Sequence, residues 1–194
     1  MSDAGLDKKK PGDARREALV LAAAQAIWID GFAASSLAKI AARADVPVGN
    51  VYYYYKTKAD IALAVADLFV AQTQSLIDEI TAQSPKPKDR LSLLVEKLRA
   101  SQAERVKHGC PIYTAVKECA RQAPQASARA GQSFELLTGF VADELKRSGV
   151  RPSIANLQAR NFVATWQGGI ALSHALGESP ILAEAFARME RLVS

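Results

Sequence analysis

The fold is decided by residues 36–58, which read SLAKIAARADVPVGNVYYYYKTK. Apolar residues three and four positions apart predict a short helix over 36–44 and a second over 47–55. The turn between them is Asp45-Val46-Pro47, and a proline suits the first position of a helix. A short helix, a turn of three to four residues and another short helix form the helix-turn-helix pattern.

The second of these helices carries the side chains that can recognise a ligand. Its four tyrosines are ambiguous by propensity alone, because aromatic and β-branched residues favour strands. Helical spacing gives it an apolar side and a polar side. The apolar side consists of Val48, Val51, Tyr52 and Tyr55, and the polar side of Gly49, Asn50, Tyr53 and Tyr54. An amide can pair with adenine, tyrosine rings can contact thymine methyls, and cations such as Lys39 can hold phosphates, so the segment is typical of a major-groove helix.

From Gly31 to Lys58 the sequence resembles the helix-turn-helix signature of the TetR/AcrR family of transcriptional regulators, and the similarity runs from about Ala14 to Ile61. The resemblance implies base or groove contacts from Val48, Gly49, Asn50 and Tyr53, and phosphate contacts from Ser36, Tyr52, Tyr54 and Lys58. It also implies that Val51 and Tyr55 pack inward together with Ile40 and Ala41.

Two positions depart from the family pattern. Asp45 stands where the family usually has glycine, at a turn position that favours the left-handed conformation, which Asp tolerates better than most residues. Pro47 stands where Ser or Thr usually caps the recognition helix. We expect that helix to form without a side-chain cap, and any phosphate contact by the missing hydroxyl is lost.

Helices separated by prolines account for the rest of the chain, so we predict an all-α protein. It comprises an N-terminal three-helix helix-turn-helix domain and a C-terminal helical bundle, with about nine helices. The expected helices are 13–30, 36–44, 47–55, 58–83, 87–107, 111–122, 124–147, 152–176 and 180–192. The predicted divisions are a flexible tail at 1–10, the DNA-binding domain at 11–57, and a ligand-binding and dimerisation domain at 58–194. The tail's three lysines are either a solvated run or an arm that touches phosphates.

Composition narrows the class of function. The chain has 194 residues and a net charge of +5, and residues 1–58 hold nine Lys and Arg against six Asp and Glu. The apolar stretch 18–29 is too short to span a membrane, and the N-terminus lacks a signal-peptide pattern, so we expect a cytoplasmic protein with no membrane partner. We predict no catalytic residues, no metal and no cofactor, since no nucleophile–base set or metal-ligand spacing occurs. The adjacent acids Asp143 and Glu144 are expected to be solvated.

The C-terminal half shows amphipathic helices and one informative junction. Paired glycines, Gly168-Gly169, suggest a close approach of another backbone, and we expect the last two helices to form a homodimer face. Cys110 follows Gly109 and precedes Pro111, so it is expected near a helix N-cap, where the helix dipole and Lys107 favour the thiolate. It is either a sensor of electrophiles or oxidants or a quiet, half-buried cysteine. The expected ligand-binding residues are Phe69, Cys110, Tyr113, Phe134, Leu137, Phe140, Phe162 and Trp166.

Together these features predict a DNA-binding transcriptional regulator. The favoured form is a homodimeric repressor on a palindromic double-stranded DNA operator, released by a small-molecule inducer or a thiol-reactive signal. The alternative is a helical small-molecule binding protein or enzyme that does not use DNA.

Overall fold

The computed structural model describes residues 11–193, which form ten α-helices and contain no strand. The helices are α1 (Pro11–Asp30), α2 (Leu37–Arg43), α3 (Val48–Tyr54), α4 (Lys58–Gln83), α5 (Pro87–Arg99), α6 (Gln102–His108), α7 (Pro111–Cys119), α8 (Pro124–Arg147), α9 (Pro152–Leu176) and α10 (Pro180–Val193). The predicted all-α class, with an N-terminal helix-turn-helix and a C-terminal helical part, is confirmed. The predicted tail at 1–10 lies outside the described residues.

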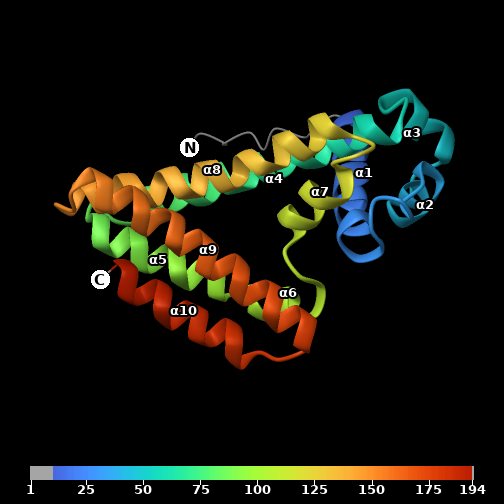
Figure 1. Ribbon diagram of the computed structural model, residues 1–194. Helices are drawn as coiled ribbons and strands as arrows, with labels where there is room; N and C mark the ends of the chain where they lie inside the picture. The colour runs from blue at the N-terminus through green and yellow to red at the C-terminus, as the bar shows by residue number, and fades with distance from the viewer. Residues whose placement is uncertain (1–10, 194) are drawn as a thin grey trace, which may run out of the picture.

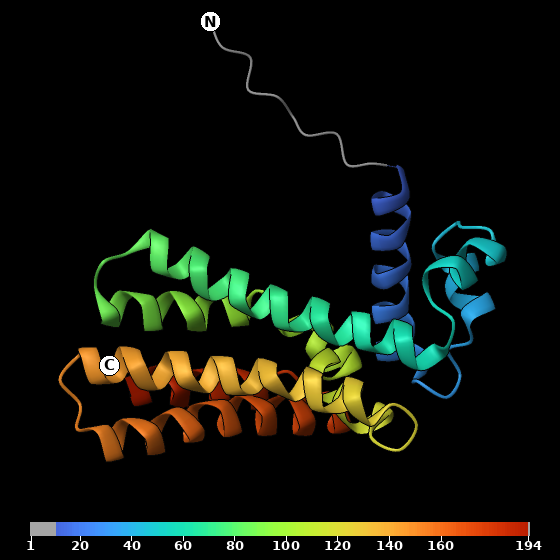
Figure 2. The same cartoon turned by 90° about the horizontal axis from the view of Figure 1, so that it is seen from above.

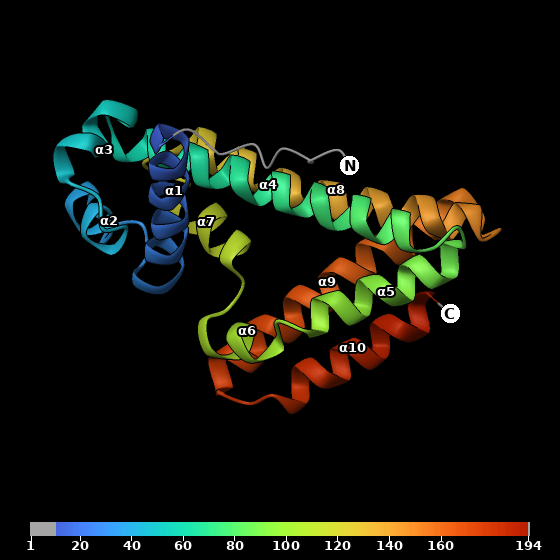
Figure 3. The ribbon, with the colours of Figure 1, turned by 180° about the vertical axis from the view of Figure 1, so that it is seen from behind.

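One expected helix is divided in two. The segment predicted as a single helix over 87–107 breaks at Ala100 and Ser101, and α6 then lies along α9 instead of continuing α5 (Figures 1 and 3). At the break the Ser101 hydroxyl donates to the carbonyl of Leu98 at 3.1 Å, and its oxygen accepts from Nε of Arg105 at 2.8 Å. Serine favours such local bonds to the backbone over an uninterrupted helix.

The long helices α4 and α8 lie side by side and connect the two ends of the molecule (Figures 1 and 2). Helices α1–α3 gather at one end, where α1 runs across α4, while α10 packs against both α5 and α9, which each contact α8 (Figures 2 and 3). α10 packs closely on α9 because Gly169 has no side chain. A Cβ at that position would lie 2.6 Å from Cβ of Ala185. The neighbouring Gly168 faces open space.

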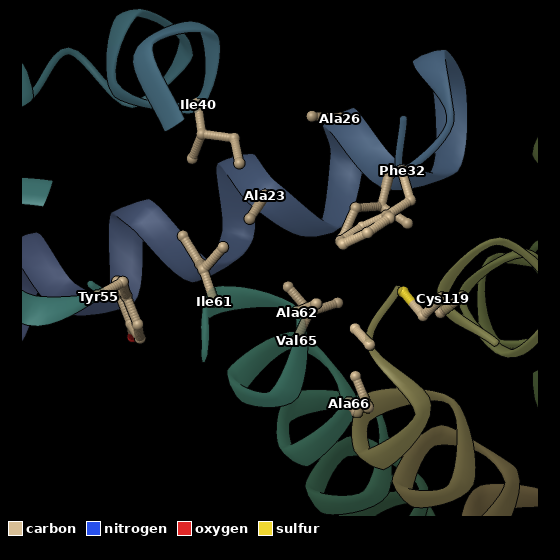
Figure 4. Close-up of a cluster of buried hydrophobic side chains, with 14 of the residues drawn as sticks. Ala23, Ala26, Phe32, Ile40, Tyr55, Ile61, Ala62, Val65, Ala66 and Cys119 are labelled. Carbon is tan, nitrogen blue, oxygen red and sulfur yellow. The ribbon is translucent and has the colours of Figure 1, made fainter. Parts of the chain in front are cut away.

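Two hydrophobic cores fill the protein. In the first, small side chains of α1 and α4, among them Ala23, Ala62 and Ala66, meet Ile40 of α2 and Cys119 of α7 (Figure 4). The second core joins the far end of α4 to α5, α8, α9 and α10. Because α4 and α8 contribute to both cores, they join the end that contains α1–α3 to the rest of the chain.

α4 also resembles a membrane span by length and composition, and it is the one such helix within residues 11–193. Its buried face packs against α1, α7 and α8. α4 is therefore a core helix.

Candidate DNA-binding surface and internal cavity

The turn between α2 and α3 has the left-handed residue that the sequence predicts. Asp45 has a φ of 53°, and it is the one non-glycine residue with positive φ in the described chain. Its N–H donates to the carbonyl of Ala42 at 3.3 Å, and the N–H of Val46 donates to that of Ala41 at 3.0 Å. This pair of bonds is a Schellman motif, which normally has glycine at the left-handed position. Asp45 thus takes the role of the family's usual glycine.

The recognition helix forms in spite of Pro47, also as expected. Pro47 adopts φ −54° and ψ 134° and precedes the helix at the N-cap position, without a side-chain hydrogen bond. The proline was expected at the first helical position; Val48 occupies that position instead. The Pro47 carbonyl still accepts from the N–H of Asn50 at 2.9 Å, so the first turn closes through the backbone.

Val51 and Tyr55 anchor α3 to the body of the domain. Val51 is fully buried and Tyr55 is 4% exposed, and both pack in the first core with Ile40 and Ala41, as the resemblance implies. The Tyr55 hydroxyl also accepts from Nε of Arg16 on α1 at 3.4 Å. This inward strip fixes which side of α3 faces away from the protein.

The expected apolar side of α3 is wrong for two of its four members. Val48 is 46% exposed and Tyr52 is 51% exposed, while Tyr53 on the opposite side is 77% exposed. A helix of seven residues touches the core along one narrow strip, so only Val51 and Tyr55 are covered. The outward surface is consequently wider than the helical projection predicts, and it includes Val48 and Tyr52.

The other expected DNA-contacting residues surround this surface. Ser36 is the N-cap of α2, its oxygen accepting from the N–H of Lys39 at 3.2 Å, and Lys39 is exposed. A Cβ at Gly49 would have no neighbouring atom within 4 Å, and Asn50 is half-exposed on α3. Tyr54 is half-buried, with its ring edge-on to that of Tyr53 at a centroid distance of 5.0 Å.

Lys58 is held by the protein itself. Its Nζ donates to the carbonyls of Phe32 and Ala33 at 2.7 and 3.2 Å and lies 4.3 Å from the centroid of the Phe32 ring. A capping box is present beside it, since Thr57 and Asp60 exchange bonds between side chain and backbone. A phosphate contact from Lys58 would require its ammonium to turn away from these carbonyls.

A small, partly open cavity lies where the two cores meet. Its volume is about 160 Å³, and α4 to α9 all contribute to its wall. Four of the expected ligand-binding residues line it: Phe69, Phe134, Leu137 and Trp166.

The remaining expected ligand-binding residues are not brought to this cavity. Phe162 is fully buried in the second core, and Phe140 lines an open groove between α4 and α8. Cys110 and Tyr113 line a separate cleft beside α7 and α9, where Tyr113 is 54% exposed. Helical spacing identifies the apolar side of each helix but not its rotation against its neighbours, so the eight residues do not form one site.

The cavity also contains polar residues that sequence reasoning missed. Arg105 of α6 and Ser133 of α8 line it, and the guanidinium of Arg105 lies 4.8 Å from the centroid of the Trp166 ring. Burial lowers the pKa of Arg105. The sequence does not indicate a role for Arg105, because its pattern predicts one helix over 87–107 and does not show that α6 turns toward α9.

Cys110 is the N-cap of α7, as expected, with Pro111 at the first helical turn. Its side chain is 4% exposed, and Nη1 of Arg105 approaches its sulfur at 3.6 Å. The cation beside the thiol is therefore Arg105, whereas the expected neighbour, Lys107, is exposed. The other cysteine, Cys119, is buried, and burial raises its pKa to about 11.

A helix-turn-helix with an outward amide-and-phenol surface, joined to a helical bundle, is the arrangement of a DNA-binding regulator. Residues 19–65 match the model of bacterial regulatory proteins of the tetR family, and residues 87–188 match the C-terminal domain of LmrA/YxaF-like transcriptional regulators. The chain belongs to the TetR family, which consists of DNA-binding transcriptional regulators and not of enzymes. No curated protein matches the chain.

Solved structures share the fold. A TetR transcriptional regulator from Legionella pneumophila is 16% identical, with a TM-score of 0.82 over 97% of this chain and 100% of that chain. The reduced form of NemR from E. coli is 17% identical, with a TM-score of 0.76 over 93% of this chain and 97% of that chain. A regulatory protein TetR from Rhodobacter sphaeroides is 20% identical, with a TM-score of 0.78 over 93% and 99%.

Proposed function

We propose that this regulator is a cytoplasmic repressor that binds a palindromic operator as a homodimer and is released by a small molecule bound in the C-terminal half. The observation that carries the proposal is the outward surface of α3, where Tyr53 is 77% exposed although α3 is anchored by Val51 and Tyr55. An exposed aromatic on an anchored helix is well placed for an external partner. The division at residue 57 into DNA-binding and effector parts belongs to the same proposal.

The proposed contacts follow from what each side chain offers. Val48, Gly49, Asn50 and Tyr53 would face base edges and thymine methyls, while Ser36, Lys39, Tyr52, Tyr54 and Lys58 would face the sugar–phosphate backbone. Lys39 now donates to the carbonyl of Ala34 at 3.1 Å, and it can reach a phosphate by a change of rotamer because it is exposed. Asn50 is the residue expected to carry most of the sequence discrimination.

The proposed dimer uses the outer face of α9. Three leucines of this helix, Leu157, Leu172 and Leu176, are 52%, 55% and 60% exposed. Helical spacing places them on the same side as Gly168, whose missing side chain leaves room for a second backbone. A two-fold dimer would set its recognition helices about 34–36 Å apart, one turn of DNA. Sedimentation at micromolar concentration should show a dimer, and a monomer alone would contradict this part.

Release requires that the cavity communicate with the DNA-binding helices. Nε1 of Trp28 on α1 donates to the carbonyls of His108 and Gly109 at 2.9 and 3.2 Å. These carbonyls lie between Arg105, which lines the cavity, and Cys110 at the start of α7. A ligand that moves α6 would therefore move a hydrogen-bond partner of α1, and an effector acts to the extent that it prefers one of the two positions.

Thiol modification is the second candidate for the signal, favoured by the contact between Arg105 and the sulfur of Cys110. Mild alkylation with iodoacetamide at about pH 8 followed by mass spectrometry should modify Cys110 and spare Cys119, whose raised pKa lowers its thiolate fraction about 100-fold. An unmodified Cys110 would remove the thiol signal from the proposal.

The function is tested by a mobility shift with DNA from upstream of the protein's own gene, at several salt concentrations. Specific retention that weakens steeply with salt is expected, because phosphate contacts release counterions. Absence of specific retention on any genomic fragment would contradict the proposed repressor.

A further inference from the structure

The internal cavity has an unusual polar lining for a space between apolar helices. Ser133 is 1% exposed and Trp166 is 2% exposed, yet the Ser133 hydroxyl and the Trp166 Nε1 have no hydrogen-bond partner within residues 11–193. Buried polar groups are nearly always paired, since an unpaired one costs about 1–3 kcal/mol. Both residues line one cavity, and the two atoms are covered by the protein in the unliganded chain, so a ligand in the cavity reaches them only with a small shift of these side chains.

Arg105 adds a positive charge to the same wall. Its Nε donates to the Ser101 hydroxyl, its Nη1 contacts the sulfur of Cys110, and its guanidinium lies over the Trp166 ring. No carboxylate pairs with it in the part of the chain that the structure describes, and burial lowers its pKa. Serine and a thiol are weak counterparts for a guanidinium, whose five donors fit a carboxylate in two parallel bonds.

The apolar part of the wall sets the size and character of the partner. Phe69, Phe134 and Leu137 line the cavity together with the ring of Trp166. An apolar cavity of about 150 Å³ in another protein holds one benzene molecule, and the volume here is about 160 Å³. The space therefore suits a single six-membered ring with a small polar substituent.

We propose that the cavity binds a small aromatic carboxylate of about the size of benzoate, with its carboxylate on Arg105 and its ring against Phe69 and Phe134. The Trp166 N–H and the Ser133 hydroxyl supply further donors to the carboxylate oxygens. This inference rests on the proposed role of the C-terminal half as the effector-binding part. It adds that the effector is an anion, which the aromatic residues of the cavity alone do not indicate.

Two other partners could satisfy the polar groups of this cavity, and the experiment below distinguishes each of them from a bound carboxylate. Ordered water would satisfy the same donors, but it would show no preference between acids and amides. The Cys110 sulfur is a partner for Arg105 alone and leaves the Ser133 hydroxyl and the Trp166 N–H unpaired.

The test measures binding of benzoate and of benzamide, its uncharged counterpart of the same size, to the purified full chain by calorimetry. Benzoate is expected to bind about 10- to 100-fold more tightly than benzamide, the range for a hydrogen bond to a charged group. Arg105→Met should remove that advantage and leave benzamide binding nearly unchanged. Lys107→Met, which changes an exposed lysine on the same helix, is the matched control and should behave as the parent chain.

A structural role for Arg105 predicts a different result. If the arginine mainly supported the fold, Arg105→Met would lower the melting temperature of the unliganded protein. The proposed site predicts an equal or higher melting temperature, because a half-buried cation without a carboxylate partner is removed. Trp166→Phe keeps the ring, removes the N–H, and should weaken benzoate binding several-fold.

Equal affinities for benzoate and benzamide, or full benzoate affinity in Arg105→Met, would overturn the proposed site. So would the absence of saturable binding of both benzoate and phenylacetate up to about 10 mM. Failure here is distinguishable from failure of the proposed function, because the same preparations are tested for operator binding. If the unliganded chain and Arg105→Met both hold the operator, the repressor stands and only the acidic effector is lost.

Discussion

The two ends of this molecule use polar side chains in opposite ways. On α3 the amide of Asn50 and the phenols of Tyr52 and Tyr53 lie on the outside, above a core of alanines and aliphatic residues. Around the cavity, Ser133 and Trp166 are buried and Arg105 is half-buried. An outward polar surface can be read from local sequence, whereas an inward one arises only when several helices meet. The DNA-binding surface can therefore be predicted from a short stretch of sequence, whereas the small-molecule cavity cannot.

The largest expected effect is on the free energy of unfolding, and it concerns Glu144, a buried carboxylate paired with two arginines. Glu144 is 1% exposed and accepts from Nη1 of Arg90 at 3.2 Å and Nη1 of Arg147 at 2.6 Å, tying α5 to α8. Its expected solvation is wrong, because α5 covers this side of α8. Glu144→Ala should lower the free energy of unfolding by about 3–5 kcal/mol in urea, since it strands a half-buried arginine. Asp143→Ala, at an exposed neighbour, should change it by less than about 0.5 kcal/mol.

This pair sharpens the comparison with Arg105. Removing Glu144, a buried charge paired with two arginines, should destabilise the unliganded protein, and removing Arg105, which has no carboxylate partner in the described chain, should not. Similar losses of stability in Glu144→Ala and Arg105→Met would show that both are structural ion sites.

The next effect separates the two adjacent glycines of α9. Gly169→Ala places a methyl 2.6 Å from Cβ of Ala185, so overpacking should cost about 1–3 kcal/mol of folding stability. Gly168→Ala meets open space and should raise helix stability by up to about 1 kcal/mol. Thermal melts compare the two, and sedimentation of Gly168→Ala reports whether that face is needed for a dimer. Equal melting temperatures would mean that α9 and α10 are not in close contact.

A smaller effect is expected at the hydrogen bond that joins the two ends. Trp28→Phe keeps the ring in place but removes the donor to His108 and Gly109. Ligand affinity of the free protein should stay the same, while the factor by which the ligand weakens operator binding should fall several-fold. The measurement is operator affinity with and without ligand for both chains. An unchanged factor would show that the signal takes another route, such as the shared helices α4 and α8.

The smallest effect is at the turn before the recognition helix. Asp45→Gly relieves the cost of a left-handed residue and should stabilise the protein by a few tenths to about 1 kcal/mol. Asp45→Ala should destabilise it, because alanine tolerates φ 53° less well. A reversed order of melting temperatures would show that the carboxylate of Asp45 has a role of its own.

Much of the DNA-binding end could be predicted because its signals are local. The left-handed Asp45, the inward Val51 and Tyr55, and the capping box at Thr57 each depend on residues within a few positions. The exposure of Val48 and Tyr52 agrees with the contacts that the family resemblance implies, whereas the helical projection placed both residues on the apolar side because it does not say how wide a contact strip is.

The cavity could be predicted only in fragments. Phe69, Phe134, Leu137 and Trp166 were recognisable as apolar residues at helical spacing, but their convergence depends on how the α4–α9 bundle packs. Arg105 was not predicted because the helix break at Ser101 turns α6 toward α9. Non-local packing decides such contacts, and a single sequence gives little information about it.

Operator affinity measured against salt concentration for the parent chain, Asn50→Ala and Lys39→Ala tests the central claim most directly. If α3 reads bases with its outward surface, Asn50→Ala should lose about 1–3 kcal/mol of preference for the operator over unrelated DNA and keep the salt dependence of the parent. Lys39→Ala should weaken binding to both DNAs alike and lower the salt slope by about 1. Full operator preference in Asn50→Ala would contradict the assignment of α3 as the reading helix.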